Sequence, residues 1–395
     1  MNAAATMAYA RSSGRPRRLV LDPWLTGSVL ALLLIGLVMV ASASIGISER
    51  ELSEPFYYFE RQLMFVTLGL VAALVGVSVP TQVWEDRSIW LLAGAFVLLI
   101  LVLTPGLGHE VNGSTRWIRL GVMNFQASEL ARVMLLTWIA SFAVRRADEL
   151  RRDFKGFMKP VGVLCAAMIL LLAEPDFGAA TVLMATGLAV LFLAGVRLRH
   201  LAVPLALGVG GMVLLAVSSD YRLRRIKAFL DPWADPYDSG FQLTQSLIAI
   251  GRGEWFGVGL GSSVQKLFYL PEAHTDFVFA VMAEEFGLAG VMLVIGLFVV
   301  LVGRALKVGR NAAAAGFEFQ SYLASAIGIW LGLQAFVNVG VNMGLLPTKG
   351  LTLPLFSYGG SSMLVTLGWL GVLARIHHET AVSGRVVVPR EARRQ

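Results

Sequence analysis

Long runs of apolar residues recur along the whole chain and constrain its fold more than any other feature. Ten segments are long enough, or nearly so, to cross the hydrocarbon layer of a bilayer as helices. They cover residues 23–44, 62–79, 89–104, 127–144, 160–173, 177–195, 201–217, 276–303, 321–345 and 353–374. The chain has 56% hydrophobic residues, 15% charged residues and a mean hydropathy of +0.69. The core of one soluble protein of 395 residues could not bury so many apolar side chains. The sequence therefore predicts an all-α polytopic membrane protein with ten transmembrane helices.

The positions of the basic residues predict the orientation of this membrane domain, residues 23–374. With the N-terminus inside, 21 of the 33 lysines and arginines lie in inner segments and 11 in outer segments, while Arg132 lies within a helix. Cytoplasmic segments of membrane proteins carry this excess. We therefore expect cytoplasmic basic tails at residues 1–22 and 375–395. The large loop 218–275, between helices seven and eight, then faces outward, which in a bacterium is the periplasm. The net charge of +7 needs no nucleic-acid partner.

The sequence lacks the residue patterns of several common kinds of site, and these kinds are therefore excluded. The single cysteine, Cys165, cannot form an intrachain disulfide. The glycines between residues 251 and 261 lack the spacing of a nucleotide-binding loop. The five histidines have neither the helical spacing nor the cysteine partners of a protein metal site. Without nucleotide-binding machinery, a reaction must draw its free energy from the substrate or from an ion gradient.

The most informative ionisable residue is Asp276, which ends the long polar loop where the eighth apolar segment begins. Ionisable groups near hydrocarbon usually face a protein interior or a water-filled cavity. On a helix, Glu284 would lie about 80° around the axis from Asp276, and Glu285 would lie on the opposite face. These residues cannot form the carboxylate pair of a retaining glycosidase. Asp276 is therefore a candidate for a lone base that is open to outside water and substrate.

Two further polar positions leave alternatives open. Glu129 and Arg132 are three residues apart on the fourth helix, so they share a face. They form either a structural ion pair or a polar cavity for a charged head group. Asp176, in the turn Glu174-Pro175-Asp176, either caps the following helix or belongs to a polar site.

Three stretches carry a resemblance to a known family. They are residues 338–362 (NVGVNMGLLPTKGLTLPLFSYGGSS), the run from Asp231-Pro232 to Gly251, and His274-Thr275-Asp276-Phe277. Together they resemble the SEDS family (shape, elongation, division and sporulation), and the resemblance covers essentially all ten helices. The run Lys349-Gly350-Leu351-Thr352-Leu353-Pro354 is similar to the cell-division branch rather than the elongation branch.

The resemblance implies an inverting peptidoglycan glycosyltransferase. Such an enzyme polymerises lipid II into glycan strands at the outer face of the inner membrane, with undecaprenyl pyrophosphate as leaving group. Asp276 matches the family's catalytic aspartate, whose expected role is general base toward the acceptor's 4-hydroxyl. No cofactor is required by the sequence. A divalent cation, Mg²⁺ or Mn²⁺, could bridge the pyrophosphate oxygens without dedicated protein ligands.

The resemblance also supplies candidate substrate-binding residues. These are Arg116, Glu129, Arg132, Asp176, His274, Lys349, Ser357 and Ser361. The chain departs from the family pattern at two of the motifs. Arg132 stands where a lysine is usual, so charge is kept but donor geometry differs. Glu174 stands where a glutamine is usual.

By the same resemblance, the expected partner is a class B penicillin-binding protein, a transpeptidase of the FtsI type. Other expected partners are division proteins such as the FtsQ, FtsL, FtsB complex and FtsN. One run of the chain, Ser263-Val264-Gln265-Lys266, has SxxK spacing, but the SDN and KTG motifs that accompany it in penicillin-binding proteins are absent from the sequence. The implied location is the bacterial inner membrane at the division septum. Two other functions stay open: a lipid II flippase, because ten helices with buried charge also describe a transporter, and a non-catalytic division scaffold.

Overall fold

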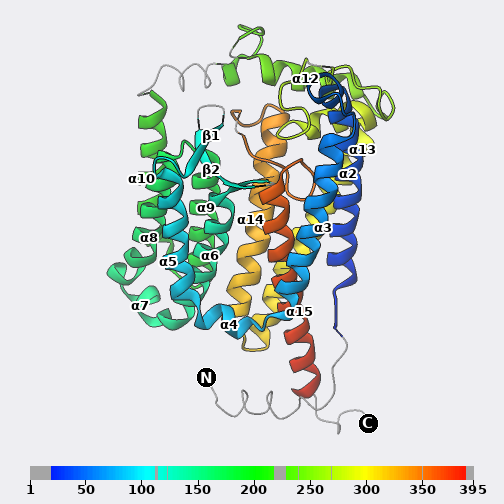
Figure 1. Ribbon diagram of the computed structural model, residues 1–395. Coiled ribbons are helices and arrows are strands. Elements are labelled where there is room, and N and C mark those ends of the chain that lie inside the picture. Colours follow the sequence, from blue (N-terminus) through cyan, green and yellow to red (C-terminus); the bar gives the residue numbers. More distant parts are fainter. Residues whose placement is uncertain are drawn as a thin grey trace.

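The computed structural model describes residues 19–111, 114–121, 123–217, 228–238, 240–267, 269–348 and 350–387. Most of the helices run side by side in one bundle (Figure 1). A small sheet and a helix that lies across the bundle mark one end, which we call the sheet end. The chain enters the bundle after residue 19 and leaves it at residue 387, both at the opposite end.

Each predicted apolar segment overlaps a helix of the bundle. These helices are α2 (Pro23–Leu52), α3 (Tyr57–Ser78), α5 (Ser88–Leu103), α6 (Ala127–Arg145), α8 (Phe154–Ala173), α9 (Phe177–Leu193), α10 (Leu198–Val217), α13 (Val278–Ala314), α14 (Glu318–Asn342) and α15 (Gly360–Val387). Shorter helices are α4 (Thr81–Asp86), α7 (Ala147–Arg152) and α12 (Phe241–Gly253). Among the described residues, six helices are long and apolar enough to cross a membrane: α2, α3, α6, α8, α13 and α14. The chain is a multi-pass membrane protein.

The expectation of an all-α fold is wrong in one segment. A three-stranded antiparallel sheet, in the order β1-β2-β3, connects α5 to α6. Its strands are β1 (Gly108–Val111), β2 (Ser114–Leu120) and β3 (Met123–Gln126), and β3 leads directly into α6. The β2 sequence STRWIRL is rich in β-branched and aromatic residues that favour strands, and helical periodicity is absent from it. Strand β2 carries Arg116, one of the candidate substrate-binding residues.

The predicted boundaries of three helices are also corrected. α2 and α13 extend beyond their apolar segments, because a helix can continue with polar turns after it leaves the hydrocarbon. Arg304 therefore lies within α13, where it pairs with Asp22, the N-cap of α2. α15 begins at Gly360 rather than at residue 353. The apolar residues before it are buried without being helical, and Leu355 has a positive φ of 64°.

Close helix packing depends on small residues. Along α3, a Cβ at Gly76 would lie 2.5 Å from the Gly368 carbonyl oxygen of α15, and one at Gly69 would lie 2.5 Å from the Leu367 side chain. From the other side, a Cβ at Gly371 would lie 2.2 Å from the Ala73 carbonyl oxygen. Small residues of this kind let membrane helices approach until their backbones touch. Helices α3 and α15 are therefore packed backbone to backbone along this stretch.

Part of the predicted outer loop is built into a break in α13. Gly287 has φ 62° and interrupts this helix. The peptide groups freed by the break bond to the segment after α12: Val258 and Gly259 donate to the carbonyls of Glu284 and Glu285, and Leu288 and Ala289 donate to those of Glu254 and Trp255. Buried backbone groups must find partners, so this segment completes the broken helix. Of the expected loop, residues 218–227, 239 and 268 lie outside the described residues.

Candidate active site

Asp276 lies two residues before Val278, where α13 begins, and α13 begins at the sheet end of the bundle (Figure 1). Its side chain is half-buried, and a Cβ at Gly350 would lie 3.1 Å from its Oδ2. Burial is the largest of the causes that raise the pKa of Asp276 from 3.8 to about 7. The charge of Glu272 also raises this pKa, whereas the charge of Arg116 lowers it. The carboxyl is therefore close to half ionised at neutral pH, as suits a general base.

Arg116, on β2, links Asp276 electrostatically to a second acid, Glu174. Glu174 follows α8 and is fully buried, and this burial raises its pKa to about 8, with a smaller opposing effect from Arg116. Neither carboxylate oxygen of Glu174 nor Nε of Arg116 has a hydrogen-bond partner among the described residues. The Ser114 hydroxyl donates to the Glu174 carbonyl at 2.8 Å, which joins the sheet to this turn. One arginine thus acts on both carboxyls.

Asp176 is the N-cap of α9, as one of the two sequence hypotheses proposed. Its Oδ1 accepts a hydrogen bond from the Ala179 amide at 3.0 Å. Its Oδ2 accepts from the Ser128 hydroxyl at 3.0 Å and from Gln126 Nε2 at 3.1 Å. The carboxylate therefore joins the start of α9 to the start of α6. Its charge also raises the pKa of Asp276, so capping and a place near the site are compatible.

Glu129 and Arg132 form an ion pair with a 2.5 Å separation, and both side chains are buried. The guanidinium also donates to Gln334 Oε1 at 3.0 Å and lies 5.1 Å from the centre of the Trp330 ring. Because α14 covers Arg132 on this side, the guanidinium meets protein atoms there rather than an open surface. The structure gives this pair the contacts of a structural link between α6 and α14.

His274 is packed among aromatic rings at the sheet end. Its ring centre lies 4.5 Å from that of Tyr58 and 5.6 Å from that of Tyr358. Burial lowers the pKa of His274, while the charges of Glu272 and Glu51 oppose this effect. The His274 carbonyl accepts from the Tyr358 amide at 3.0 Å. These contacts fix the segment before Asp276 against α3 and the segment before α15.

The two serines carried over from the family are engaged in internal hydrogen bonds. Ser357 Oγ accepts from the Leu353 amide at 2.9 Å, which closes the turn before α15. Ser361 Oγ accepts from the Gln126 amide at 2.8 Å and donates to the Asn124 carbonyl at 3.2 Å. Both serines thus hold the site's framework together. Lys349 lies outside the described residues.

Glu284 and Glu285 have partners of their own away from Asp276. Arg252 donates to Glu284 at 2.9 Å. Lys266 donates to Glu285 at 2.8 Å and to Ser42 at 2.9 Å. Asp276 precedes α13, so the angle expected from a continuous helix does not apply. The two glutamates instead fasten the segment after α12 to α13 and α2.

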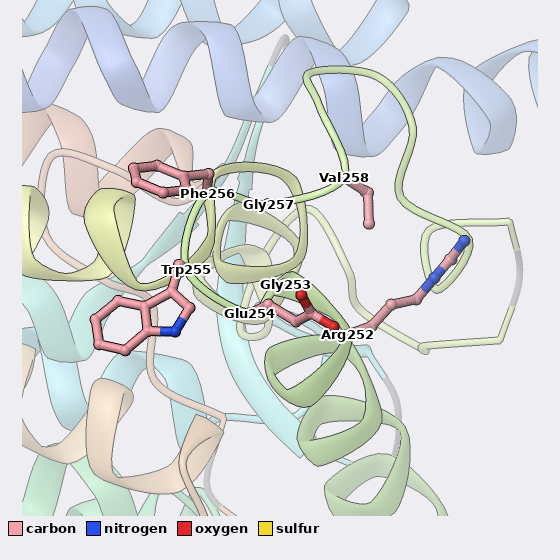
Figure 2. Close-up of a pocket in the computed structure, with 7 residues that line it drawn as sticks. All are labelled: Arg252, Gly253, Glu254, Trp255, Phe256, Gly257 and Val258. Carbon is pink, nitrogen blue, oxygen red and sulfur yellow. The ribbon is translucent and has the colours of Figure 1, made fainter.

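An open cavity of about 410 Å³ lies beside this segment and is lined by Arg252, Gly253, Glu254, Trp255, Phe256, Gly257 and Val258. Figure 2 shows the Trp255 and Phe256 rings on one side and the Arg252 side chain extending to the other. Asp276 is not among its lining residues. The cavity is therefore separate from the candidate active site.

Sequence reasoning missed the amides that surround this site. Gln126 binds Asp176. On α14, Asn338 and Asn342 bind the Asp276 carbonyl, and Gln334 binds the Thr352 carbonyl. The signal was present in the sequence, because the three α14 amides recur every four residues within an apolar segment. Among the described residues, no group of three or more histidine, cysteine, aspartate or glutamate side chains is arranged to hold a metal ion.

Comparison with known proteins decides the family. The sequence model of the protein family that contains the cell-cycle proteins FtsW, RodA and SpoVE matches residues 23–382 of this chain. The chain belongs to this family. The predicted resemblance to the SEDS family, and to its cell-division branch, is confirmed by curated family members of similar sequence.

One family member, from Thioalkalivibrio sulfidiphilus, is named a probable peptidoglycan glycosyltransferase FtsW; it is 56% identical over 94% of this chain and 92% of its own length. A second, from Coxiella burnetii, has the same name and is 54% identical over 91% of this chain and 96% of its own length.

Two solved structures of the family share the fold. One belongs to a peptidoglycan synthase complex that coordinates polymerization and crosslinking, with a TM-score of 0.76 and 31% identity over 92% of this chain and 99% of that one. The other is Rod shape determining protein RodA of Thermus thermophilus, with a TM-score of 0.68 and 30% identity over the same shares.

Proposed function

We propose that this chain is a peptidoglycan glycosyltransferase that polymerises lipid II, with Asp276 as its general base. One observation carries the proposal: a half-buried carboxyl at the sheet end has a pKa of about 7 and lies within the influence of Arg116. A base with this pKa can accept a proton at neutral pH and release it afterwards. The names of the family members from T. sulfidiphilus and C. burnetii support the same activity.

The proposed reaction is a single displacement with inversion. Asp276 takes the proton from the 4-hydroxyl of the acceptor sugar as that oxygen attacks the donor's anomeric carbon. The bond from this carbon to the pyrophosphate oxygen breaks, and undecaprenyl pyrophosphate leaves with the electron pair. The protonated carboxyl then returns its proton to water. Arg116 is the proposed contact for the departing phosphates, because its guanidinium is permanently charged and matches phosphate geometry.

The membrane arrangement is part of the proposal. We infer that the chain has ten transmembrane helices and that both termini lie in the cytoplasm. The sheet end and the loop 218–275 would then lie in the periplasm, at the division septum. The distribution of basic residues supports this orientation. Asp276 would then face the side on which glycan strands are assembled. Two points about cofactors stay predictions. The first is that the chain requires no cofactor, and the second is that Mg²⁺ or Mn²⁺ can act through the substrate pyrophosphate.

A transpeptidase of the FtsI type is the proposed partner, because the related synthase complex coordinates polymerization with crosslinking. The FtsQ, FtsL, FtsB complex and FtsN are further proposed partners, on the family resemblance alone. The remaining carried-over residues, Glu129, Arg132, Asp176, His274, Lys349, Ser357 and Ser361, stay candidates for substrate binding.

The test is polymerisation of lipid II in detergent by the purified chain with its transpeptidase partner. We expect glycan strands from the unaltered protein. Asp276→Asn should lower the rate by roughly 10²–10⁴-fold, the usual contribution of a positioned general base. Asp238→Asn is the matched control, because Asp238 is an exposed carboxylate of the same outer segment. It should leave the rate unchanged.

The assay also separates the competing functions. A flippase or a scaffold would make no glycan strands in detergent. Because detergent contains no membrane with two sides, transport of lipid II cannot contribute to the signal. Full activity of Asp276→Asn would remove Asp276 from the chemistry. Partner binding by Asp276→Asn, measured by co-purification, should equal that of the unaltered chain.

A further inference from the structure

Helix α14 lies in the centre of the bundle (Figure 1). Three buried carboxamides share one face of this helix. Gln334, Asn338 and Asn342 are each four residues apart, so they follow one another along the helix at intervals of about 6 Å. Each is at most 2% exposed. A buried amide is costly unless it is hydrogen-bonded, so the partners of these amides indicate their purpose.

The upper two amides hold the main chain of Asp276. Nδ2 of Asn338 donates to the Asp276 carbonyl oxygen at 2.9 Å, and Nδ2 of Asn342 donates to the same oxygen at 3.0 Å. Oδ1 of Asn342 accepts from the Ala280 amide at 3.2 Å, in the first turn of α13. That contact fixes which way the Asn342 amide faces, so its NH₂ group points to Asp276.

Asn338 and Gln334 also hold a second segment, the one that contains Leu351 and Thr352 and borders the Asp276 carboxylate. Nδ2 of Asn338 donates to the Leu351 carbonyl at 2.6 Å, and Nε2 of Gln334 donates to the Thr352 carbonyl at 3.1 Å. Next to Leu351, Gly350 lies against the Asp276 carboxylate. We call this row of three amides, Gln334, Asn338 and Asn342, the amide ladder. It fixes the position of the main chain at Asp276 and of the main chain at residues 350–352, which borders the carboxylate.

The ladder also explains the buried charge on α6. Arg132 donates to Oε1 of Gln334 at 3.0 Å, which leaves Nε2 of Gln334 directed to Thr352. Arg132 is in turn held by Glu129. The ion pair thus orients the lowest amide, and its influence reaches the segment beside Asp276 through one side chain.

We propose that Gln334, Asn338 and Asn342 are positioning residues for glycosyl transfer, which together fix the Asp276 carboxylate in its reactive place. This inference rests on the proposed function. All three act through main-chain carbonyls and need no contact with substrate. Displacement of a base by about 1 Å can cost a factor of about 100 in rate, so loss of a tether should lower kcat more than it changes KM.

The test compares amide-to-carboxylate variants on α14. Asn342→Asp and Gln334→Glu keep side-chain size but replace the donating NH₂ with oxygen, which repels a carbonyl. Gln334→Glu also keeps the acceptor for Arg132, so it preserves that contact. The matched control is Gln320→Glu, because Gln320 is a buried amide of the same helix that donates to Thr81 at 2.9 Å, near the other end of α14.

We expect kcat to fall at least tenfold in Asn342→Asp and Gln334→Glu, with KM within about twofold and a thermal midpoint no lower than that of Gln320→Glu. Gln320→Glu should keep its kcat. Equal kcat values in ladder and control variants would overturn the inference, as would a rise in KM alone. Where Asn342→Asp does not fold, Gln334→Glu decides. Full activity in Asp276→Asn would instead overturn the proposed function.

Discussion

The pH dependence of the polymerisation rate tests the site most directly. With a pKa of about 7, Asp276 is about 9% ionised at pH 6 and about 91% ionised at pH 8. Only the ionised form can accept a proton, so kcat/KM, which reports groups of the free enzyme, should rise roughly tenfold between these pH values. An unperturbed carboxyl would be fully ionised throughout this range and would give a flat profile.

Two charge-removing variants should move this profile in opposite directions. The negative charge of Glu272 raises the pKa of Asp276, so Glu272→Gln should shift the midpoint to lower pH. Glutamine keeps an acceptor for the Thr275 hydroxyl, which bonds to Glu272 at 2.6 Å. The positive charge of Arg116 lowers the same pKa, so Arg116→Gln should shift the midpoint to higher pH. A downward shift of about half a unit would raise the ionised fraction at pH 6 from about 9% to about 24%, and the rate by a factor of about 2.6.

The assay measures initial rates of lipid II polymerisation from pH 5.5 to 8.5 at constant ionic strength. The midpoint is the informative quantity, because Arg116→Gln also removes a proposed phosphate contact and should lower the whole curve. A flat profile for the unaltered chain would refute the assignment of Asp276 as base. Shifts of both variants in the same direction would refute the electrostatic account of its pKa.

Two further predictions concern stability, measured as resistance to unfolding in detergent. Lys266→Met leaves Glu285 buried without its cation and should cost about 3–5 kcal/mol, whereas adding Glu285→Gln should recover most of that loss; an unchanged midpoint in the single variant would contradict the ion pair. Gly36→Ala places a Cβ 2.7 Å from the Phe356 backbone and should cost about 1–3 kcal/mol, while Gly27→Ala, with nothing within 4 Å, should not. Equal midpoints in the two alanine variants would argue against this close contact.

Hydropathy predicted the helices well because a helix that faces lipid must be apolar over a minimum length. It predicted their ends less well. Residues 353–356 are apolar, yet they belong to the irregular, buried segment before α15. A hydropathy pattern measures burial in apolar surroundings and does not separate a helix from an irregular segment packed inside the bundle. The backbone of Phe356 occupies the space left by Gly36, a contact across the bundle that no local pattern encodes.

The individual polar residues show the same division. Asp176 could be predicted as a helix cap because capping depends on neighbouring residues. The choice between an ion pair and an open polar cavity at Arg132 could not be made from spacing, because Gln334 and Trp330, which cover it, come from another helix. The amide ladder has a visible period in the sequence, but its partners at Asp276, Leu351 and Thr352 belong to other segments.

The sequence alone determined that this chain crosses a membrane many times, and its motifs identified Asp276 as the candidate base. Both follow from local properties, namely the length of apolar runs and the order of residues in short motifs. The tertiary structure decided which groups surround that carboxylate: Arg116 from the sheet, Gly350 from the segment before α15, and the amides of α14. Burial and charge at a site depend on distances between segments far apart in the chain, and only the packed helices set those distances.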